Sequence, residues 1–211
     1  KLVGVDASGL ELRMLAHYLN DKEFINEILN GDIHTANQAR AGLESRTQAK
    51  TFIYAFLYGA GDAKIGRVVG GNRQTGRRIK QSFLNNFPTL KSLRHRIKRE
   101  AEQYEYIKAL DGRKIFIRSS HAALNSLLQG AGAIVMKRGL IILNEMLQEN
   151  IVDAHVVANV HDEWQIETWH EDVDRLGEMA VSAIRQAGDY YKLNCPLDAK
   201  YKVGENWSET H

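Results

Sequence analysis

The sequence predicts an α+β fold in which helices back an antiparallel sheet and an all-helical module is inserted into that sheet. Three observations predict it. A strand-like run opens the chain, a block of helical segments follows, and two hairpin signals come later. Strands that are separated by helices and joined by hairpins pair as an antiparallel sheet with helices packed against it.

The first half of the chain is predicted to be mostly helical after a strand over residues 2–7. Apolar residues then recur at helical spacing, and capping residues divide the segments. Asp32 and Ser45 stand where N-caps are expected, and glycines end several segments. The expected helices are LELRMLAHYLN, DKEFINEILNG, DIHTANQARAG, SRTQAKTFIYAFLYGAG and two basic helices over about 72–85 and 88–103.

The second half alternates hairpins with helices. EYIKALDGRKIFIRS holds an Asp-Gly pair between two short β-like runs, which is a strong hairpin signal. A long helix is expected over about 121–148, followed by a hairpin made by residues 156–160 and 164–168. An amphipathic helix over about 171–190 and a strand near 197–203 complete the predicted fold.

Length and composition are those of a globular domain. The 211 residues, 44% of them apolar, are enough to bury a substantial core. A single cysteine, Cys195, cannot form an internal disulfide and suggests a reducing compartment. No apolar run approaches the roughly 18–20 residues of a membrane span, and no signal peptide is visible. Since the chain opens without Met on an apolar strand, we expect a C-terminal fragment of a longer protein.

Charge is distributed unevenly along the chain. Residues 72–118 hold 13 Lys/Arg and 4 Asp/Glu, a local charge of +9, whereas the other residues hold 15 and 22, or −7. A basic middle beside an acidic remainder indicates a polyanionic partner. A solvated helix surface is the alternative interpretation.

Acidic residues lie at the ends of two predicted strands. Asp6 is near the end of the first strand, and Asp162 and Glu163 are at the tip of the late hairpin, with no Lys or Arg nearby in sequence. If strand pairing brings them together, their mutual repulsion raises their pKa values, and Mg²⁺ removes that penalty. Two such ions can clamp the attacking and leaving oxygens of a phosphoryl displacement. Solvated turn acids are the alternative.

A second group of candidate residues recurs every four positions on the helix expected after Ser45. Arg46, Lys50, Tyr54 and Tyr58 share one stripe of that helix. Two cations and two aromatic rings suit the phosphates, sugar and base of a nucleotide. The alternative is that the tyrosines pack half-buried and the cations are solvated.

An amide pair lies on the long helix expected after the basic hairpin. Asn125 and Gln129 are again four residues apart and share one face. Such amides can donate hydrogen bonds to acceptors in the minor groove of a nucleic acid. Most exposed pairs of this kind have no such role.

Together these segments resemble the family A DNA polymerases, the group of bacterial DNA polymerase I. DASGLELR, RTQAKTFIYAFLYG and VHDE resemble the three polymerase motifs of the family in order and spacing, and GDIHT, LDGRK and LNSLLQGAGA fall where the family has similar segments. NWSETH is similar to the C-terminus of the replicative polymerases of short-tailed phages. The resemblance covers essentially the whole chain. It implies a palm over residues 1–33 and 105–211 and fingers over 34–104, with thumb and exonuclease domains absent.

The resemblance implies a catalytic centre with two Mg²⁺ ions. Asp6 and Asp162 resemble the metal-binding aspartates of the palm, and the backbone carbonyl of Ala7 would be a further ligand. Glu163 resembles a third catalytic acid that supports the site. Lys50 would protonate the leaving pyrophosphate.

The resemblance also assigns the incoming nucleotide to one set of residues. His34, Arg46 and Lys50 would hold the triphosphate, and the hydroxyl of Tyr54 can stand in for a missing 3′-OH. Glu11 resembles the steric gate that excludes a ribose 2′-OH.

Primer–template DNA is assigned to a further set of residues. Tyr58 would lie on the template side, Asn125 and Gln129 would read the minor groove at the primer terminus, and His161 would touch the primer end.

The function implied by the resemblance is template-directed DNA synthesis from dNTPs on a primer–template, in the cytoplasm of a bacterial or archaeal phage host. We expect no membrane association, no proofreading and no processivity partner on this fragment. One alternative is a nucleic-acid-binding fragment with little turnover without its thumb. Another is a single-subunit RNA polymerase, which Glu11 and Glu163 disfavour. A metal phosphohydrolase using His161 and Asp162 lacks the additional histidines of such sites.

Overall fold

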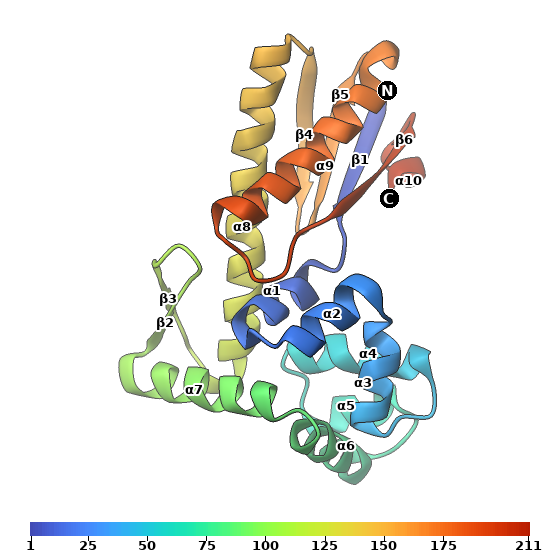
Figure 1. Cartoon of the computed structure of the whole chain (residues 1–211). Helices are drawn as coiled ribbons and strands as arrows, with labels where there is room; N and C mark the ends of the chain where they lie inside the picture. The colour runs from blue at the N-terminus through green and yellow to red at the C-terminus, as the bar shows by residue number, and fades with distance from the viewer. The chain divides into compact units, whose positions relative to one another are not determined.

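The structure, a computed structural model, describes residues 1–211 and confirms the α+β fold (Figure 1). The chain divides into a sheet unit, residues 1–14 and 129–211, and a helical unit, residues 15–128. Residues 15–33 and 105–128 belong to the helical unit of this division.

The sheet unit is built on four antiparallel strands in the order β4-β5-β1-β6. The first strand of the chain, β1, lies between β5 and β6, and its apolar residues Val3 and Val5 are fully buried. The strands are β1 (Leu2–Ala7), β4 (Ala154–Val160), β5 (Glu163–Thr168) and β6 (Ala199–Gly204). The apolar run at the start of the chain therefore becomes an interior strand, as its composition predicts.

One face of this sheet is covered by the long helices α8 (Ala123–Asn150) and α9 (Val173–Tyr190), and Figure 1 shows α9 crossing the sheet. Trp164 on β5 is fully buried there. Gly139 lets α8 approach closely, because an added Cβ would lie 2.7 Å from the Trp164 ring. This face supplies the hydrophobic core of the unit.

The other face is covered in part by a short C-terminal helix, α10 (Trp207–Thr210). Gly4 makes room for it, because an added Cβ would lie 2.6 Å from the carbonyl oxygen of Thr210. Side chains alternate along a strand, so Asp6 on β1 and Glu163 on β5 face the same side as Gly4. Two acidic side chains thus share the α10 side of the sheet.

The helical unit contains the rest of α1 (Leu10–Leu19) and six further helices. As expected, the carboxylate of Asp32 caps one of them by accepting from the backbone N–H of His34, and the Ser45 hydroxyl caps the next. Phe83 packs edge-to-face against three other phenylalanine rings in its core. The helices are α2 (Lys22–Asn30), α3 (Ile33–Ala41), α4 (Arg46–Leu57), α5 (Asp62–Val68), α6 (Arg73–Asn85) and α7 (Pro88–Tyr104), followed by the hairpin β2 (Tyr106–Lys108) and β3 (Lys114–Phe116).

Two helices were not expected from the sequence, α5 and α10. The first has seven residues and no side-chain cap, but it packs closely on α6. An added Cβ at Gly66 would lie 1.9 Å from the carbonyl oxygen of Asn72, and one at Gly76 would lie 2.0 Å from that of Asp62. Tertiary contact, rather than local propensity, therefore stabilises α5.

One segment, Ser120–Asn150, is long and apolar enough to cross a membrane by length and composition. It comprises α8 and the turn before it, and half of its most apolar stretch is buried inside the structure. Val135 and Leu143 of this helix are fully buried, as in the core helix of a globular unit. The sequence suggested no apolar run of this length, because polar residues interrupt this helix, but its mean hydropathy over the stretch is still as high as that of a membrane span.

Candidate functional site

A group of carboxylates gathers at one end of the sheet, where β1 ends and β5 begins. Asp6 lies directly opposite Glu163 in the β1–β5 ladder. The next residue, Ala7, donates its backbone N–H to the carbonyl of Asp162 at 2.9 Å. Strand pairing thus places Asp6 beside Asp162, although 155 residues separate them in sequence.

The turn that presents Asp162 is tight. Val160 pairs with Glu163, so the hairpin loop consists of His161 and Asp162 alone. His161 has a φ of +55°, in the left-handed region that few residues other than Gly, Asn, Asp and His adopt readily. His161 thus occupies a turn position that glycine often fills but that histidine tolerates.

The electrostatics of this end of the sheet agree with clustered acids. Burial raises the pKa of Asp6, and the negative charges of Asp162 and Glu163 raise it further. Burial also raises the pKa of Asp162, to which the nearby carboxylate of Glu11 contributes. The structure therefore brings together Asp6, Asp162, Glu163 and Glu11, and a cation at this point would relieve their repulsion.

Glu163 differs from the two aspartates because its carboxylate is occupied by donors from its own chain. Trp207 donates its indole N–H to Oε1 at 2.6 Å, Gln165 donates to the same oxygen, and His211 lies against Oε2. Burial alone would raise the pKa of Glu163, but these hydrogen bonds together lower it. Gln165, Trp207 and His211 were not predicted as site residues from the sequence, although Trp207 and His211 lie in the segment NWSETH, which carries part of the resemblance.

The donor set at Asp6 and Asp162 suits a hard divalent cation. Both side chains offer only oxygen, and Ala7, whose carbonyl is the third expected ligand, ends β1 directly after Asp6. No three His, Cys, Asp or Glu side chains in residues 1–211 form a cluster that could enclose a metal ion. Mg²⁺ keeps several waters and is often bound through one or two carboxylates, so two aspartates leave coordination positions for phosphate oxygens.

The second predicted group lies in the helical unit, on α3 and α4. The ring of His34 is 6.2 Å from that of Tyr54, centroid to centroid. Burial lowers the pKa of His34, and the positive charges of Arg46 and Lys50 lower it further. The structure thus brings all four residues together. His34 Nδ1 is buried and has no hydrogen-bond partner within the chain.

Arg46 and Lys50 differ in their present partners. The guanidinium of Arg46 bonds to Asp32 at 2.6 Å and holds the pKa of that carboxyl well below its usual range. Lys50 is exposed and forms no ion pair. A triphosphate bound here would meet one uncompensated lysine and one arginine that can exchange its exposed partner.

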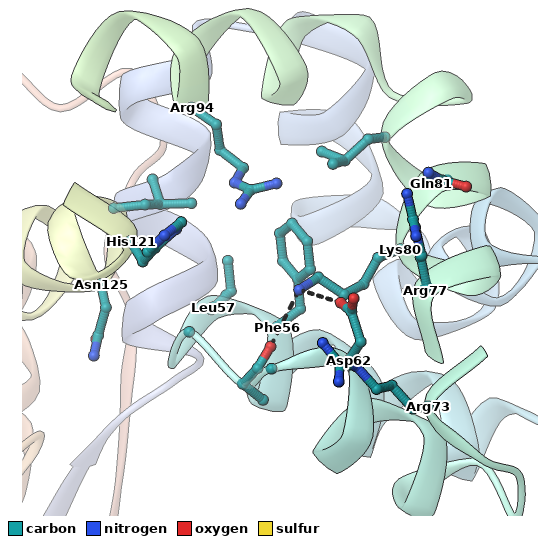
Figure 2. Close-up of a pocket in the computed structure, with 15 residues that line it drawn as sticks. Phe56, Leu57, Asp62, Arg73, Arg77, Lys80, Gln81, Arg94, His121 and Asn125 are labelled. Atoms are coloured by element: carbon teal, nitrogen blue, oxygen red, sulfur yellow. Dashed lines mark hydrogen bonds and ion pairs between the residues drawn. The ribbon is translucent and has the colours of Figure 1, made fainter. Parts of the chain in front are cut away.

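A basic pocket of about 620 Å³ opens among α4, α5, α6 and α7, as Figure 2 shows. Asn125, one of the predicted DNA contacts, lines it. Tyr58, 45% exposed, caps the C-terminal end of α4 directly before Gly59 and Ala60 of the pocket wall. The pocket is lined by Phe56, Leu57, Gly59, Ala60, Gly61, Asp62, Arg73, Arg77, Lys80, Gln81, Leu84, Arg94, His121, Leu124 and Asn125.

The side chains that line this pocket carry a net positive charge. Lys80 pairs with the only carboxylate in the wall, Asp62, at 3.0 Å (Figure 2). Arg73 and Arg77 form no ion pair, and Arg94 lies 5.2 Å above the ring of Phe56, where burial lowers its pKa. The uneven charge of the sequence is therefore concentrated in part around one cavity, which suits an anionic ligand.

The remaining predicted DNA contacts, His161 and Gln129, both belong to the sheet unit. His161 is exposed in the hairpin loop beside Asp162, whose pKa its charge lowers. Gln129 is exposed on α8, one helical turn after Asn125.

Comparisons with known proteins match the whole chain. Residues 1–209 match the family model described as DNA polymerase family A. The DNA-directed DNA polymerases of Enterobacteria phage T3 and Escherichia phage T7 are 44% and 45% identical to the chain, over 99% of its length. The DNA polymerase I of Pseudomonas aeruginosa is 26% identical over 100% of the chain and a quarter (25%) of its own length.

The chain spans about a third (33%) of the length of the two phage relatives. Among solved structures, the POL domain of Pol1 from M. smegmatis, in complex with DNA primer-template and dNTP, matches 99% of the chain with a TM-score of 0.87 and 20% identity. The match covers 40% of that structure's chain. At this identity the likeness concerns the fold.

Proposed function

The chain belongs to DNA polymerase family A, and we propose that it is the part of a DNA-directed DNA polymerase that carries out nucleotidyl transfer from a dNTP to a primer 3′-OH. The observation that carries this proposal is the pairing of Asp6 opposite Glu163 with Asp162 in the adjoining turn. This pairing puts two oxygen-donor side chains at one exposed edge of a sheet, where their charges repel.

Asp6, Asp162 and the carbonyl of Ala7 would hold two Mg²⁺ ions. Bound there, the ions would lower the pKa of the primer 3′-OH and neutralise charge on the pyrophosphate leaving group. The pKa values of both aspartates are raised by burial and, to a smaller extent, by neighbouring carboxylates, and a divalent cation would favour their charged forms. His161, at the turn, would contact the primer end.

The cations of α3 and α4 would bind the triphosphate of the incoming dNTP. Lys50, with no carboxylate partner, would bind phosphate and donate a proton to the leaving pyrophosphate. Arg46 would exchange Asp32 for phosphate oxygens, and His34 would donate to a phosphate through its buried ring nitrogen. The neighbouring ring of Tyr54 would pack against the sugar.

Primer–template DNA would use the minor-groove amides and the basic pocket. Asn125 and Gln129, one turn apart on α8, would donate to acceptors at the primer terminus, and Tyr58 would stack at the template side. The unpaired Arg73 and Arg77 in the pocket suit phosphates of the single-stranded template. No sequence-specific contact is needed for this binding.

Selection of deoxynucleotides is proposed for Glu11. Its carboxylate lies near Asp162, whose pKa it raises, so it is positioned at the metal site. There its side chain would occupy the space that a ribose 2′-OH needs.

We propose that the parts carrying these roles are a palm, residues 1–33 and 105–211, and fingers, residues 34–104. We also propose that the protein acts in the cytoplasm of the phage host.

Extension of a primed oligonucleotide by the 211-residue chain tests this function. We expect Mg²⁺-dependent, template-directed addition of dNTPs in preference to rNTPs, and loss of addition in Asp162→Asn with unchanged circular dichroism. Tight DNA binding without extension would favour a nucleic-acid-binding fragment instead. Equal use of rNTPs would favour an RNA polymerase.

A further inference from the structure

The C-terminal segment of the chain is tied to the acid next to the metal-binding turn. Each carboxylate oxygen of Glu163 has a donor from this chain: Trp207 and Gln165 at Oε1, and His211 at Oε2. The Glu163 side chain is only 8% exposed. Its oxygens are therefore already engaged, unlike those expected of a metal ligand.

The network extends to a second layer of buried polar groups. Thr210 donates its hydroxyl to Gln165 Oε1 at 2.7 Å, which leaves the amide of Gln165 to donate to Glu163. Glu163, Gln165 and Thr210 are three of only five buried polar residues in residues 1–211. Buried polar networks in which each member is satisfied hold a single geometry, because any shift leaves a polar group unpaired.

The C-terminus itself is held in place. Lys202 on β6 donates to the carbonyl of His211 at 2.8 Å. Gly4 provides the space against β1 that lets α10 approach the sheet. The segment Trp207–His211 is thus fixed to β1, β5 and β6 at once.

Glu163 is the ladder partner of Asp6 and the chain neighbour of Asp162, so its backbone is coupled to that of both aspartates. We propose that Glu163 is a positioning residue, and that the C-terminal segment Trp207–His211 sets the spacing of Asp6 and Asp162 through it. The donors also engage both carboxylate oxygens of Glu163, so neither oxygen is left for a cation. This inference rests on the proposed metal site and assigns the C-terminal segment to it.

Trp207→Phe is the most direct test, since it removes one N–H donor and keeps an aromatic ring. Loss of a group that hydrogen-bonds a metal ligand typically weakens metal affinity by about 10- to 100-fold. Trp207 acts one residue further out, through Glu163, so we expect the Mn²⁺ dissociation constant to rise by up to about tenfold. Titration of the 211-residue chain by electron paramagnetic resonance measures it without substrate. The Mg²⁺ concentration for half-maximal primer extension should rise in parallel.

Trp169→Phe is the matched control. Trp169 also donates its indole N–H to a carboxylate, that of Asp153 at 3.0 Å, but at the opposite end of the same hairpin. We expect the Mn²⁺ affinity of the Trp169→Phe variant to equal that of the wild type. Thr210→Val keeps the shape of the side chain and removes the hydroxyl, and it should weaken Mn²⁺ binding less than Trp207→Phe does. If Trp207→Phe fails to fold, the Mn²⁺ affinity of Thr210→Val tests the inference in its place.

Two results would overturn the inference alone. One is wild-type Mn²⁺ affinity in Trp207→Phe and Thr210→Val, and the other is a Glu163→Gln variant that loses Mn²⁺ binding as completely as Asp162→Asn, which would make Glu163 a ligand. A wild-type chain that binds no Mn²⁺ would overturn the proposed metal site as well.

Discussion

Gly4→Ala is predicted to destabilise the chain by pushing the C-terminal helix away from β1. An added Cβ would lie 2.6 Å from the carbonyl oxygen of Thr210 and 2.7 Å from both Thr210 Cβ and Gln165 Nε2. Gly4 does not have a positive φ, so alanine itself is compatible with the backbone. The effect should therefore come from steric overlap with α10 and not from backbone strain.

The magnitude follows from two opposing contributions. Overpacking of this kind costs about 1–3 kcal/mol, whereas alanine in place of glycine inside a strand gains about 0.5–1 kcal/mol. The net loss of unfolding free energy is about 0–2.5 kcal/mol, towards the upper end because the overlap is with a backbone oxygen. For a protein of this size, that lowers the midpoint of thermal unfolding by up to roughly 10 °C.

Removal of residues 207–211 should reverse the sign. Without α10 the overlap with Thr210 disappears and the terminal amide of Gln165 can move, so Gly4→Ala should stabilise the shortened chain by about 0.5–1 kcal/mol. Thermal unfolding of the four proteins, monitored by circular dichroism, completes the cycle. The same sign in both backgrounds would refute the packing of α10 on Gly4.

Three further predictions concern the helical unit. The wild-type chain should accept dideoxynucleotides readily and Tyr54→Phe should discriminate against them; equal incorporation by both would remove Tyr54 from the nucleotide site. Replacing Arg73 and Arg77 with Gln should reduce the slope of log K against log salt for single-stranded DNA by about 0.7 for each lost phosphate contact, whereas Arg99→Gln, outside the pocket, should leave it unchanged. Asp32 has a pKa below its unfolded value because of Arg46, so its contribution to stability is present above about pH 4 and is lost as the pH falls through the native pKa. Asp32→Asn keeps the helix cap but removes the titrating carboxyl. The difference between the thermal unfolding midpoints of the wild type and the variant should therefore become smaller as the pH is lowered. A difference that does not change with pH would argue against the Asp32–Arg46 pair.

Local signals were sufficient to predict most elements of the fold. Asp32 and Ser45 cap helices α3 and α4 as expected, because a side chain that accepts a backbone N–H acts within one turn. The Asp-Gly pair forms the expected hairpin. Helices α5 and α10 were missed because they are short. Their packing depends on glycines that let distant elements approach closely, and a local sequence pattern does not contain that information.

Some residues of the candidate site could be predicted from the sequence, and others could not. Periodicity alone placed Arg46, Lys50 and Tyr54 on one stripe, and the helix bears this out. The meeting of Asp6 with Asp162 depends on long-range strand pairing, so it required the resemblance to a family. The hydrogen bonds of Glu163 to Trp207 and His211 depend on how the last residues fold back, which neither spacing nor motif indicates.

The claim on which this account depends is that Asp6 and Asp162 hold divalent cations jointly. Mn²⁺ titration of the wild type, Asp6→Asn, Asp162→Asn and the double variant measures this directly. Joint ligation predicts that each single change weakens binding by at least about tenfold and that the second change adds little, since groups that act as a unit are not additive. Independent, additive effects, or wild-type affinity in either single variant, would contradict a shared site.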